Sequence, residues 1–381
     1  MSRITIVGLG NIGSHLPGLM GRLEGVSGIT LVDPDSYEPK NVPCQSIDAG
    51  DLGPKVHVQA RRLRRINPRL SIRPLCARVE DVPLGLLRGD VILAALDSRA
   101  SRRAVNRVAW RLNTPWIDAA VDGAGLLVRV IAYLPGPDAP CLECAYDAND
   151  YALLEQEYPC VPNGRGAPAT NAPAGLGAIA AGLMALECRK LLAGERQDVL
   201  AGRQVLMDLM HHVHDVTRYR RQAGCKFDHG TWSIASLEAP FSRLALGDLF
   251  RRAMDDASGA SEGWAVRLEG HSFTRVLFCP GCGGQTPCGP CLLHRLPPRR
   301  RHCPACGGEM VARGFDCYDW LEEAALTNRD RRRSLASLGF RPGDIVTVRG
   351  PGGEQHWELG GPAASARPAR ALAFAGGVHH G

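Results

Sequence analysis

Short apolar runs alternate with longer amphipathic stretches through the first 120 residues of the chain. Such runs predict buried strands, and the amphipathic stretches between them predict helices. The predicted strands cover residues 4–7, 28–33, 70–76, 90–96 and 115–120, and the predicted helices cover residues 11–23, 53–67 and 99–112. Strands that alternate with helices in this way are typical of a parallel, doubly wound α/β sheet.

The pattern changes after residue 121, where helices no longer separate every pair of strands. Strands are predicted at residues 125–134, 203–209 and 214–220, with one apolar helix over residues 175–192. Adjacent strands without a crossover helix indicate antiparallel pairing. The fold class predicted for this part is therefore α/β, with a Rossmann-like sheet that is parallel in its first half and has an antiparallel extension.

Changes in composition divide the rest of the chain. Closely spaced cysteines predict a small zinc ribbon, a β-rich pattern follows it, and the end is rich in Ala, Pro, Gly and Arg, which is typical of disorder. The predicted domains are 1–230, a connecting region 231–270, a zinc-ribbon region 271–315, a small β-rich unit 316–361 and a disordered tail 362–381.

Composition and charge narrow the class of protein. Hydrophobic residues make up 45% and charged residues 22% of the 381 positions, as in ordinary globular proteins. The apolar stretch at 172–186 is shorter than the roughly 20 residues of a membrane span, and no secretory signal precedes the first strand. A cytoplasmic protein is predicted, so its 14 cysteines indicate metal sites or reactive thiols instead of disulfides.

Net charge gives little support for nucleic-acid binding. The formal charge is +6, and the most basic tract is Arg299 to Arg301. Such a tract can contact nucleic acid, but a solvated loop is the preferred interpretation.

A glycine loop follows the first predicted strand. Gly8, Gly10 and Gly13 allow the backbone to approach a phosphate at a helix N-terminus, where amide N–H groups favour an anion. Asp33 lies 20 residues beyond Gly13, a suitable place to accept hydrogen bonds from ribose hydroxyls. These residues alone are equally typical of a dinucleotide site.

Other polar residues favour a triphosphate with a metal ion. Lys55 begins a helix after Gly53-Pro54, where an ammonium group can cancel phosphate charge. Asp97 follows the predicted strand at residues 90–96, at the edge of the sheet where ligands bind in open α/β folds, and a carboxylate beside a triphosphate suits Mg²⁺. Asn41 and Gln45 add neutral hydrogen-bonding groups.

Taken together, these motifs resemble the ThiF/MoeB family, the adenylation core shared with ubiquitin-activating enzymes. The resemblance covers about residues 1–230. It is carried in order by Gly8-x-Gly10-x-x-Gly13-Ser14, Asp33-x-Asp35, Asn41-x-x-x-Gln45, Gly53-Pro54-Lys55, Ile66-Asn67-Pro68, Asp97 with Arg102 and Asn106, and Pro140-Cys141-x-x-Cys144.

The resemblance implies adenylation of the C-terminal glycine of a ubiquitin-like or sulfur-carrier protein by Mg–ATP. It also implies a homodimer, and a conjugating enzyme or sulfurtransferase as a further partner. By this resemblance Asp33 holds ribose, Lys55 the phosphates and Asp97 the magnesium ion, while Asn41 positions ATP. The other residues expected at the nucleotide site are Gly8, Gly10, Gly13, Asp35, Gln45, Arg102 and Asn106.

Two features depart from the family pattern. The family usually has arginine before Gln45, but this chain has Cys44, so Arg102 or Arg99 is expected to substitute. The family often receives an arginine from an N-terminal helix of a second subunit, and this chain starts directly at the first strand. A zinc-ribbon adaptor on a degenerate nucleotide fold is therefore one alternative, and an NAD(P)-dependent oxidoreductase is another.

Two zinc sites are predicted. The spacing of Cys141 and Cys144 indicates one half-site. The resemblance implies a second cysteine pair near the end of the adenylation domain, where this chain has Cys225 and His229, so these two are proposed to complete the site, with Asp228 as the rival for the fourth position. A zinc ribbon is predicted from two Cys-x-x-Cys-Gly pairs, which comprise Cys279, Cys282, Cys303 and Cys306.

Three of the cysteines outside these two sets also point to chemistry. Cys288 and Cys291 lie between the ribbon pairs and are expected to be spare or alternative ligands. Cys160 lies in a Pro- and Gly-rich stretch, where the resemblance implies a thiol that takes the activated glycine as a thioester or persulfide.

Overall fold

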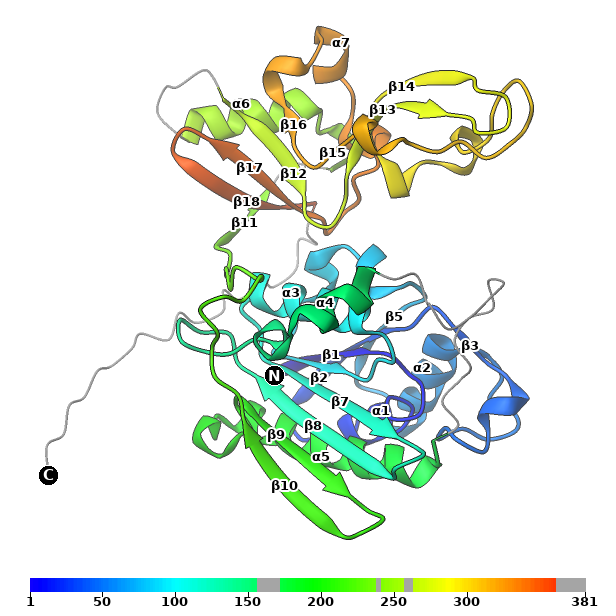
Figure 1. Cartoon of the computed structure of the whole chain (residues 1–381), viewed down its shortest axis with the longest axis vertical. Coiled ribbons are helices and arrows are strands. Elements are labelled where there is room, and N and C mark those ends of the chain that lie inside the picture. Colours follow the sequence, from blue (N-terminus) through cyan, green and yellow to red (C-terminus); the bar gives the residue numbers. More distant parts are fainter. Residues whose placement is uncertain (156–171, 238–240, 257–262, 361–381) are drawn as a thin grey trace, which may run out of the picture. The chain divides into compact units, whose positions relative to one another are not determined.

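The computed structural model describes residues 1–155, 172–237, 241–256 and 263–360, which form two compact units (Figure 1). The first unit is Met1–Ile234, and the second begins at Ala235. Among the described residues, no helix is long and apolar enough to cross a membrane.

The first unit is built on an eight-stranded sheet with the order β10-β9-β8-β7-β6-β1-β2-β5. Strands β5, β2, β1, β6 and β7 pair in parallel, whereas β8, β9 and β10 extend the sheet in antiparallel fashion. This arrangement confirms the predicted fold class. The strands are β1 Ser2–Val7, β2 Val26–Val32, β5 Ser71–Leu75, β6 Val91–Ala94, β7 Trp116–Asp122, β8 Leu127–Tyr133, β9 Arg203–Asp208 and β10 Val213–Arg218.

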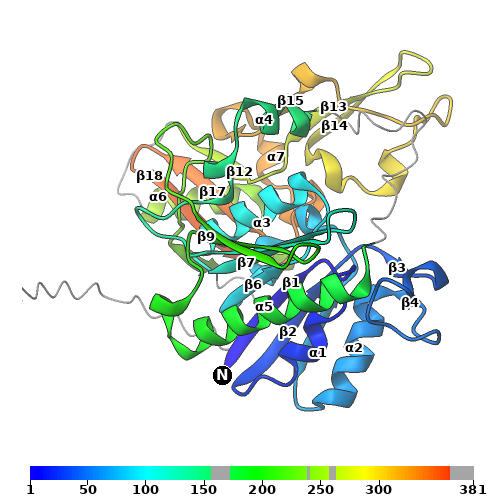
Figure 2. The same cartoon turned by 60° about the horizontal axis from the view of Figure 1, so that its bottom comes forward.

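Helices cover both faces of this sheet (Figure 2). Because side chains alternate along a strand, each strand contributes to two cores. In β6, Val91 and Leu93 pack in the core that includes side chains of α1, α2 and α5, while Ile92 and Ala94 pack in the core that includes α3. The helices are α1 Leu16–Met20, α2 Lys55–Ile66, α3 Arg99–Arg111, α4 Ala148–Glu155 and α5 Ala174–Ala193, and a small hairpin is formed by β3 Ser36–Tyr37 and β4 Gly53–Pro54.

The first helix is shorter than predicted. Residues 11–23 are expected to be helical, but α1 begins at Leu16 and ends at Met20, after a series of turns. Pro17 explains the late start because its ring lacks an N–H and interferes with the carbonyl one turn earlier. The glycine loop therefore leads into turns before the helix begins.

The second unit contains a five-stranded sheet with the order β11-β18-β17-β12-β16. Strand β12, from the predicted connecting region 231–270, pairs with β17 from the predicted β-rich unit 316–361, so these two stretches share one sheet and one core. The strands are β11 Ile234–Leu237, β12 Ala265–Leu268, β16 Leu321–Glu322, β17 Ile345–Gly350 and β18 Gly353–Leu359, and the helices are α6 Leu246–Asp256 and α7 Asn328–Arg331.

A separate three-stranded sheet carries the cysteine-rich segment of the second unit. Its central strand is β13 Phe273–Phe278, which pairs with β14 Gln285–Leu292 and β15 Cys317–Tyr318. A small apolar core that includes Cys279 and Cys303 packs beside it.

Candidate active site and metal centres

The glycine loop makes a tight turn at the carboxyl end of β1. Gly8 has a φ angle of +85°, and a Cβ atom there would lie 2.2 Å from the carbonyl oxygen of Ala95. A Cβ atom on Gly13 would lie 1.9 Å from the oxygen of Gly8, whereas one on Gly10 would meet nothing within 4 Å. In the described part of the chain, the amide N–H groups of Gly10 and Asn11 have no intramolecular acceptor. Free amide donors beside open space suit a phosphate group.

The predicted nucleotide residues gather at one edge of the sheet. The glycine loop, Asp33 and Asp97 follow β1, β2 and β6, and β1 pairs in parallel with both of the other two strands. After β1 the chain forms β2 on one side of β1, and it later forms β6 on the other side of β1. Such a reversal of strand order is where open α/β sheets bind their ligands.

Lys55 and two carboxylates form an ion-pair group at this edge. Its ammonium nitrogen lies 3.0 Å from Asp35 Oδ2 and 3.7 Å from Asp33 Oδ1. Lys55 and Asp33 are buried, with exposed fractions of 7% and 5%. Burial raises the pKa of Asp33, and the charge of Lys55 opposes this shift.

Backbone donors hold the Asp33 carboxylate in place. Oδ2 accepts from the amide N–H of Leu9 at 2.7 Å, and Oδ1 accepts from that of Asp35 at 2.8 Å. Each carboxylate oxygen can accept a second hydrogen bond. Asp33 is therefore fixed against the glycine loop and retains acceptor capacity for a hydroxyl group.

Two residues that the sequence analysis missed support the same loop. The Tyr37 hydroxyl donates to the carbonyl of Leu9 at 2.8 Å and accepts from Gln59 Nε2 at 2.9 Å. Both side chains are almost fully buried. The available signal was a glutamine at a buried position of α2, where an apolar residue is the usual choice.

Asp97 and Arg102 differ in their freedom to bind a ligand. Asp97 is exposed, and its carboxylate has no partner among the described residues. Arg102 donates to Asp118 Oδ1 at 3.0 Å and to the carbonyl of Leu96. Arg129 pairs with the other oxygen of Asp118, a completely buried carboxylate. Arg102 thus supports the loop that carries Asp97, and Asp118 was detectable as a charge within an apolar strand.

Asn41, Cys44 and Gln45 lie in the turn that follows β3. The side-chain oxygen of Asn41 accepts from the amide N–H of Glu38 at 2.8 Å. The carbonyl of Cys44 accepts from Asn11 Nδ2 at 2.6 Å, which ties this turn to the glycine loop. Gln45 Oε1 is buried and has no hydrogen-bond partner in the described structure, so it is available to a ligand.

Three further residues from the sequence predictions are Asn106, Arg99 and Cys160. Asn106 is completely buried, and its oxygen accepts from the amide N–H of Leu142 at 3.2 Å, so it holds the Cys141–Cys144 turn. Arg99, the alternative to Arg102, pairs with Asp150. Cys160 lies outside the described residues.

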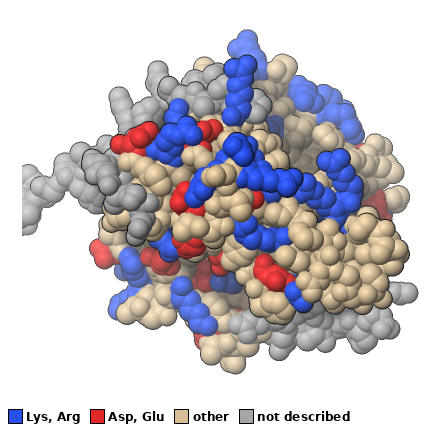
Figure 3. All heavy atoms as spheres, turned by 90° about the horizontal axis from the view of Figure 1, so that it is seen from above, with Lys and Arg blue, Asp and Glu red and all other residues tan. Residues whose placement is uncertain are grey.

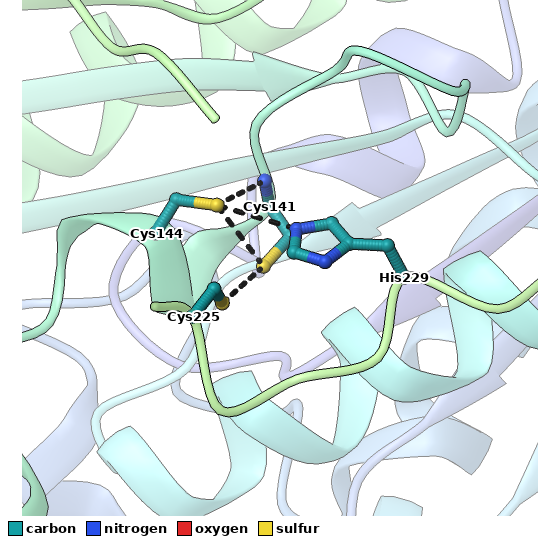
Figure 4. A group of neighbouring side chains, drawn as sticks. All are labelled: Cys141, Cys144, Cys225 and His229. Carbon is teal, nitrogen blue, oxygen red and sulfur yellow. Dashed lines mark hydrogen bonds between the residues drawn. The ribbon is translucent and has the colours of Figure 1, made fainter. Parts of the chain in front are cut away.

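Cys141, Cys144, Cys225 and His229, here called the first cluster, point toward one another (Figure 4). Their ligand atoms all lie within 4.8 Å of one another. The sulfur of Cys141 lies 3.8 Å from that of Cys144 and 3.7 Å from that of Cys225. Two thiolates on a tetrahedral zinc ion, with Zn–S bonds of about 2.3 Å, stand about 3.8 Å apart. The donor set and its spacing therefore fit zinc.

Asp228, the rival fourth ligand, has a different partner. Its two carboxylate oxygens accept from Arg111 Nη1 and Nη2 at 2.7 and 2.8 Å. The same guanidinium group donates to the carbonyl of Gly230 at 2.8 Å. This pair positions the segment so that His229, with its ring 4.8 Å from that of Trp110, joins the three thiols.

Burial decides the protonation of the first cluster in the absence of a metal ion. Burial and the neighbouring thiols raise the pKa of Cys141, and burial raises that of Cys225. Burial lowers the pKa of His229, which keeps its imidazole neutral and able to ligate a metal. Because thiolates are the ligating form, metal binding must offset the cost of deprotonation.

Cys279, Cys282, Cys303 and Cys306, here called the ribbon cluster, also lie within 4.8 Å of one another. Two matching turns present them. Gly283 N–H donates to the carbonyl of Cys279 at 2.9 Å, and Gly307 N–H donates to that of Cys303 at 2.9 Å. Both glycines have positive φ, +72° and +74°, a conformation that favours glycine. Tetrahedral zinc fits these four thiols as well.

The basic tract at Arg299 to Arg301 has a structural use. Arg301 donates to the carbonyls of Leu296 and His294 at 3.0 and 3.1 Å. Basic side chains are prominent on the face of the molecule in Figure 3, where acidic ones are interspersed. An uninterrupted basic surface is therefore not seen on that face.

Comparisons with known proteins agree with the architecture of the first unit. The sequence model described as the ThiF family matches residues 1–227. The Molybdopterin-synthase adenylyltransferase of Escherichia coli K12 is 29% identical over 229 residues, which cover 59% of this chain and 86% of that protein. The Sulfur carrier protein ThiS adenylyltransferase of the same strain is 29% identical over 232 residues, with coverage of 59% and 84%.

Among solved structures, E. coli MccB is similar to the first unit. The match has a TM-score of 0.48 and 23% identity, and it covers 59% of this chain and 66% of the MccB chain.

Proposed function

This chain belongs to the ThiF family, and we propose that it adenylates the C-terminal carboxylate of a ubiquitin-like or sulfur-carrier protein with ATP and Mg²⁺. The observation that carries the proposal is the meeting of a free-amide glycine loop, a fixed Asp33 and a buried Lys55 at one edge of the sheet. Two similar proteins named as adenylyltransferases align with most of their length, which supports the same reaction class.

The proposed roles follow from the contacts of each residue. Asp33 retains acceptor capacity for ribose hydroxyls, and the N–H groups of Gly10 and Asn11 are available to phosphate oxygens. Lys55 is held beside this loop by Asp33 and Asp35, so its charge is already in place before ATP arrives. A preorganised charge of this kind stabilises the transition state without reorganisation cost.

The attacking carboxylate and the triphosphate are both anions, so charge cancellation is the main requirement of the reaction. Mg²⁺, when bound, supplies part of this cancellation. The exposed carboxylate of Asp97, at the end of β6, is its proposed protein ligand. Arg102 and Asp118 position the loop that carries it.

The test is ATP–pyrophosphate exchange with Mg²⁺ and a panel of small proteins that end in Gly-Gly. Lys55→Ala is expected to reduce exchange on the order of 10²–10³, as for removal of one preorganised donor. Lys40→Ala is the matched control because Lys40 is an exposed lysine paired with Glu38, and its exchange should be unchanged.

Two outcomes would count against the proposal. Full activity of Lys55→Ala would show that Lys55 does not stabilise the phosphate charge in this reaction. Absence of exchange with every carrier, from protein that is folded and loaded with zinc, would favour the adaptor alternative. Transfer of the activated glycine to Cys160 remains a prediction from the resemblance.

We also propose that the first unit pairs with a second copy. The supporting feature is a set of exposed apolar side chains on two helices that pack together: Ile179 and Leu186 on α5 and Leu19 on α1 are 39%, 56% and 38% exposed. Leu186→Glu is expected to reduce the molar mass by half in light scattering, whereas Arg218→Glu, a charge change at an exposed position of β10 away from α5, should not. A monomeric wild-type protein would contradict this.

A further inference from the structure

One cysteine pair is not used by either metal cluster. Cys288 and Cys291 lie in β14, with their sulfur atoms 3.4 Å apart. Among the residues that the structure describes, the first cluster and the ribbon cluster are the groups in which three or more potential metal ligands converge. Two thiols without a third ligand do not make a complete zinc site. Among the described residues, Cys288 and Cys291 are therefore a pair of free thiols in contact.

The backbone of this pair also differs from that of the zinc turns. In the ribbon cluster, a glycine with positive φ follows the second cysteine of each pair, at Gly283 and Gly307. In Cys288-Gly289-Pro290-Cys291 the glycine with positive φ, Gly289 at +63°, lies between the two cysteines. The turn that presents thiolates to a metal is thus replaced by a different loop.

This loop is a bulge in the hairpin of β13 and β14. Thr274 pairs with Cys291 and Val276 pairs with Pro287, so Cys288, Gly289 and Pro290 all lie opposite Arg275 alone. Bulges re-aim side chains and are frequent beside active sites. Here the bulge brings two cysteines of one strand into sulfur–sulfur contact.

A half-buried arginine fixes the bulge. Arg333 Nη1 donates to the carbonyl of Pro290 at 2.8 Å and approaches that of Cys288 at 3.5 Å. Arg333 Nη2 donates to the carbonyl of Ser337 at 3.1 Å, which anchors the guanidinium group from the other side. A cation held next to a thiol stabilises its thiolate form.

The two thiols are unequal, as an exchange reaction requires. Cys288 is partly exposed, whereas Cys291 is 2% exposed. The Cys291 thiol donates to Cys288, and this hydrogen bond, with the charges of Arg300 and Arg333, lowers the pKa of Cys288. The same hydrogen bond and burial raise the pKa of Cys291. Cys288 is therefore the accessible nucleophile, and Cys291 is the protected second thiol.

We propose that Cys288 and Cys291 form a thiol–disulfide exchange site whose substrate is a disulfide. The Cys288 thiolate attacks one sulfur of the substrate, breaks its S–S bond, forms a mixed disulfide and releases one thiolate. Cys291 then loses its proton to solvent, attacks Cys288 Sγ and releases the second thiolate. The two protein thiols lose two electrons, and the substrate gains them and becomes two thiols.

The test uses the full-length, zinc-loaded protein in buffers of increasing glutathione disulfide to glutathione ratio. After acid quenching and alkylation, peptide mass spectrometry is expected to find a Cys288–Cys291 disulfide while both zinc equivalents remain bound. Cys291→Ser should accumulate glutathione on Cys288, and Cys288→Ser should form neither product. At pH 7, Cys288 should alkylate at least about tenfold faster than Cys291, because thiolate fraction scales tenfold for each unit of pKa.

Three results would overturn the proposal. The first is that both thiols stay reduced in every buffer. The second is that the disulfide forms only after zinc has left the ribbon cluster, which would make it a product of unfolding. The third is that the Cys288→Ser, Cys291→Ser double variant loses a zinc equivalent, which would make the pair metal ligands. Cys317→Ser, a cysteine of the neighbouring strand β15, is the matched control, and the disulfide mapping on wild-type protein stands even if a variant does not fold.

Discussion

The first cluster and the ribbon cluster offer zinc similar spacing in very different surroundings. Around the first cluster, Trp110 and Phe227 pack closely, and the unit that contains it has two extensive apolar cores on its sheet. Around the ribbon cluster there is a small core, and Cys282 and Cys306 are exposed. A metal ion in the first cluster would link loops of a unit that its two cores already stabilise. A metal ion in the ribbon cluster would supply stability that the small core beside it does not.

The difference also appears in how each cluster is assembled from sequence. Each half of the ribbon cluster is a local turn with its own glycine and its own backbone hydrogen bond. The first cluster brings together cysteines 84 residues apart, and its second half depends on Arg111 in α3. Local turns form with little help from the rest of the chain, but the first cluster needs the sheet and α3 to be folded beforehand.

Loss of a ribbon ligand should have the largest effect. Cys303→Ala is expected to release the metal and leave residues 279–311 without stable structure, because structural zinc contributes about 10–16 kcal/mol of apparent binding free energy. The measurements are the zinc-to-protein ratio and hydrogen exchange across this segment. Cys317→Ala, which changes a cysteine of the same sheet outside the cluster, should retain both zinc and protection. Full protection from hydrogen exchange in Cys303→Ala would show that the ribbon segment does not depend on zinc. The two clusters would then not differ in the way described above.

Loss of a ligand from the first cluster should have a smaller, local effect. Cys225→Ala is expected to lose one zinc equivalent but to destabilise the unit by only about 1–3 kcal/mol, since the two sheet cores are untouched. Hydrogen exchange should increase at residues 139–146 and 225–232, while β1, β6 and β7 stay protected. Cys76→Ala, an exposed cysteine of the same unit, is the control. Global unfolding of the first unit would show that this cluster, too, is essential to its fold.

Sequence patterns were most informative where structure is local. The apolar runs predicted the parallel strands and the antiparallel extension, and cysteine spacing predicted the ribbon cluster and the Cys141–Cys144 half of the first cluster. The other half, Cys225 and His229, was expected from the family resemblance. Hydrophobic periodicity and cysteine spacing are sufficient to predict these features because each pattern extends over only a few residues. The helix at residues 11–23 was predicted too long because the effect of Pro17 on the preceding turn was underestimated.

Long-range contacts explain what the sequence could not predict. The motif order places Asn106 at the nucleotide site, which stays a prediction, whereas its contact with the amide N–H of Leu142, 36 residues away, has no signal in the local sequence. Residues 231–270 are predicted to be connecting structure because strand β12 has no pairing partner nearby in the sequence. Its partner β17 lies about eighty residues later. In each case, a pairing between distant segments decides the role of a residue whose local pattern is uninformative.

The smallest expected effect distinguishes the two candidates for the fourth ligand of the first cluster. Asp228→Asn should keep the zinc equivalent and reduce stability by about 1 kcal/mol, because the Asn side-chain oxygen can still accept one hydrogen bond from the buried Arg111. The Asp228 side chain is 64% exposed, and Arg111 keeps its hydrogen bond to the Gly230 carbonyl and its contact with the Phe227 ring. His229→Gln, in contrast, should lose that zinc equivalent in metal analysis of the purified protein. If Asp228→Asn lost zinc and His229→Gln retained it, the fourth ligand would be the carboxylate, and the first cluster would be as dependent on solvent-exposed groups as the ribbon cluster is.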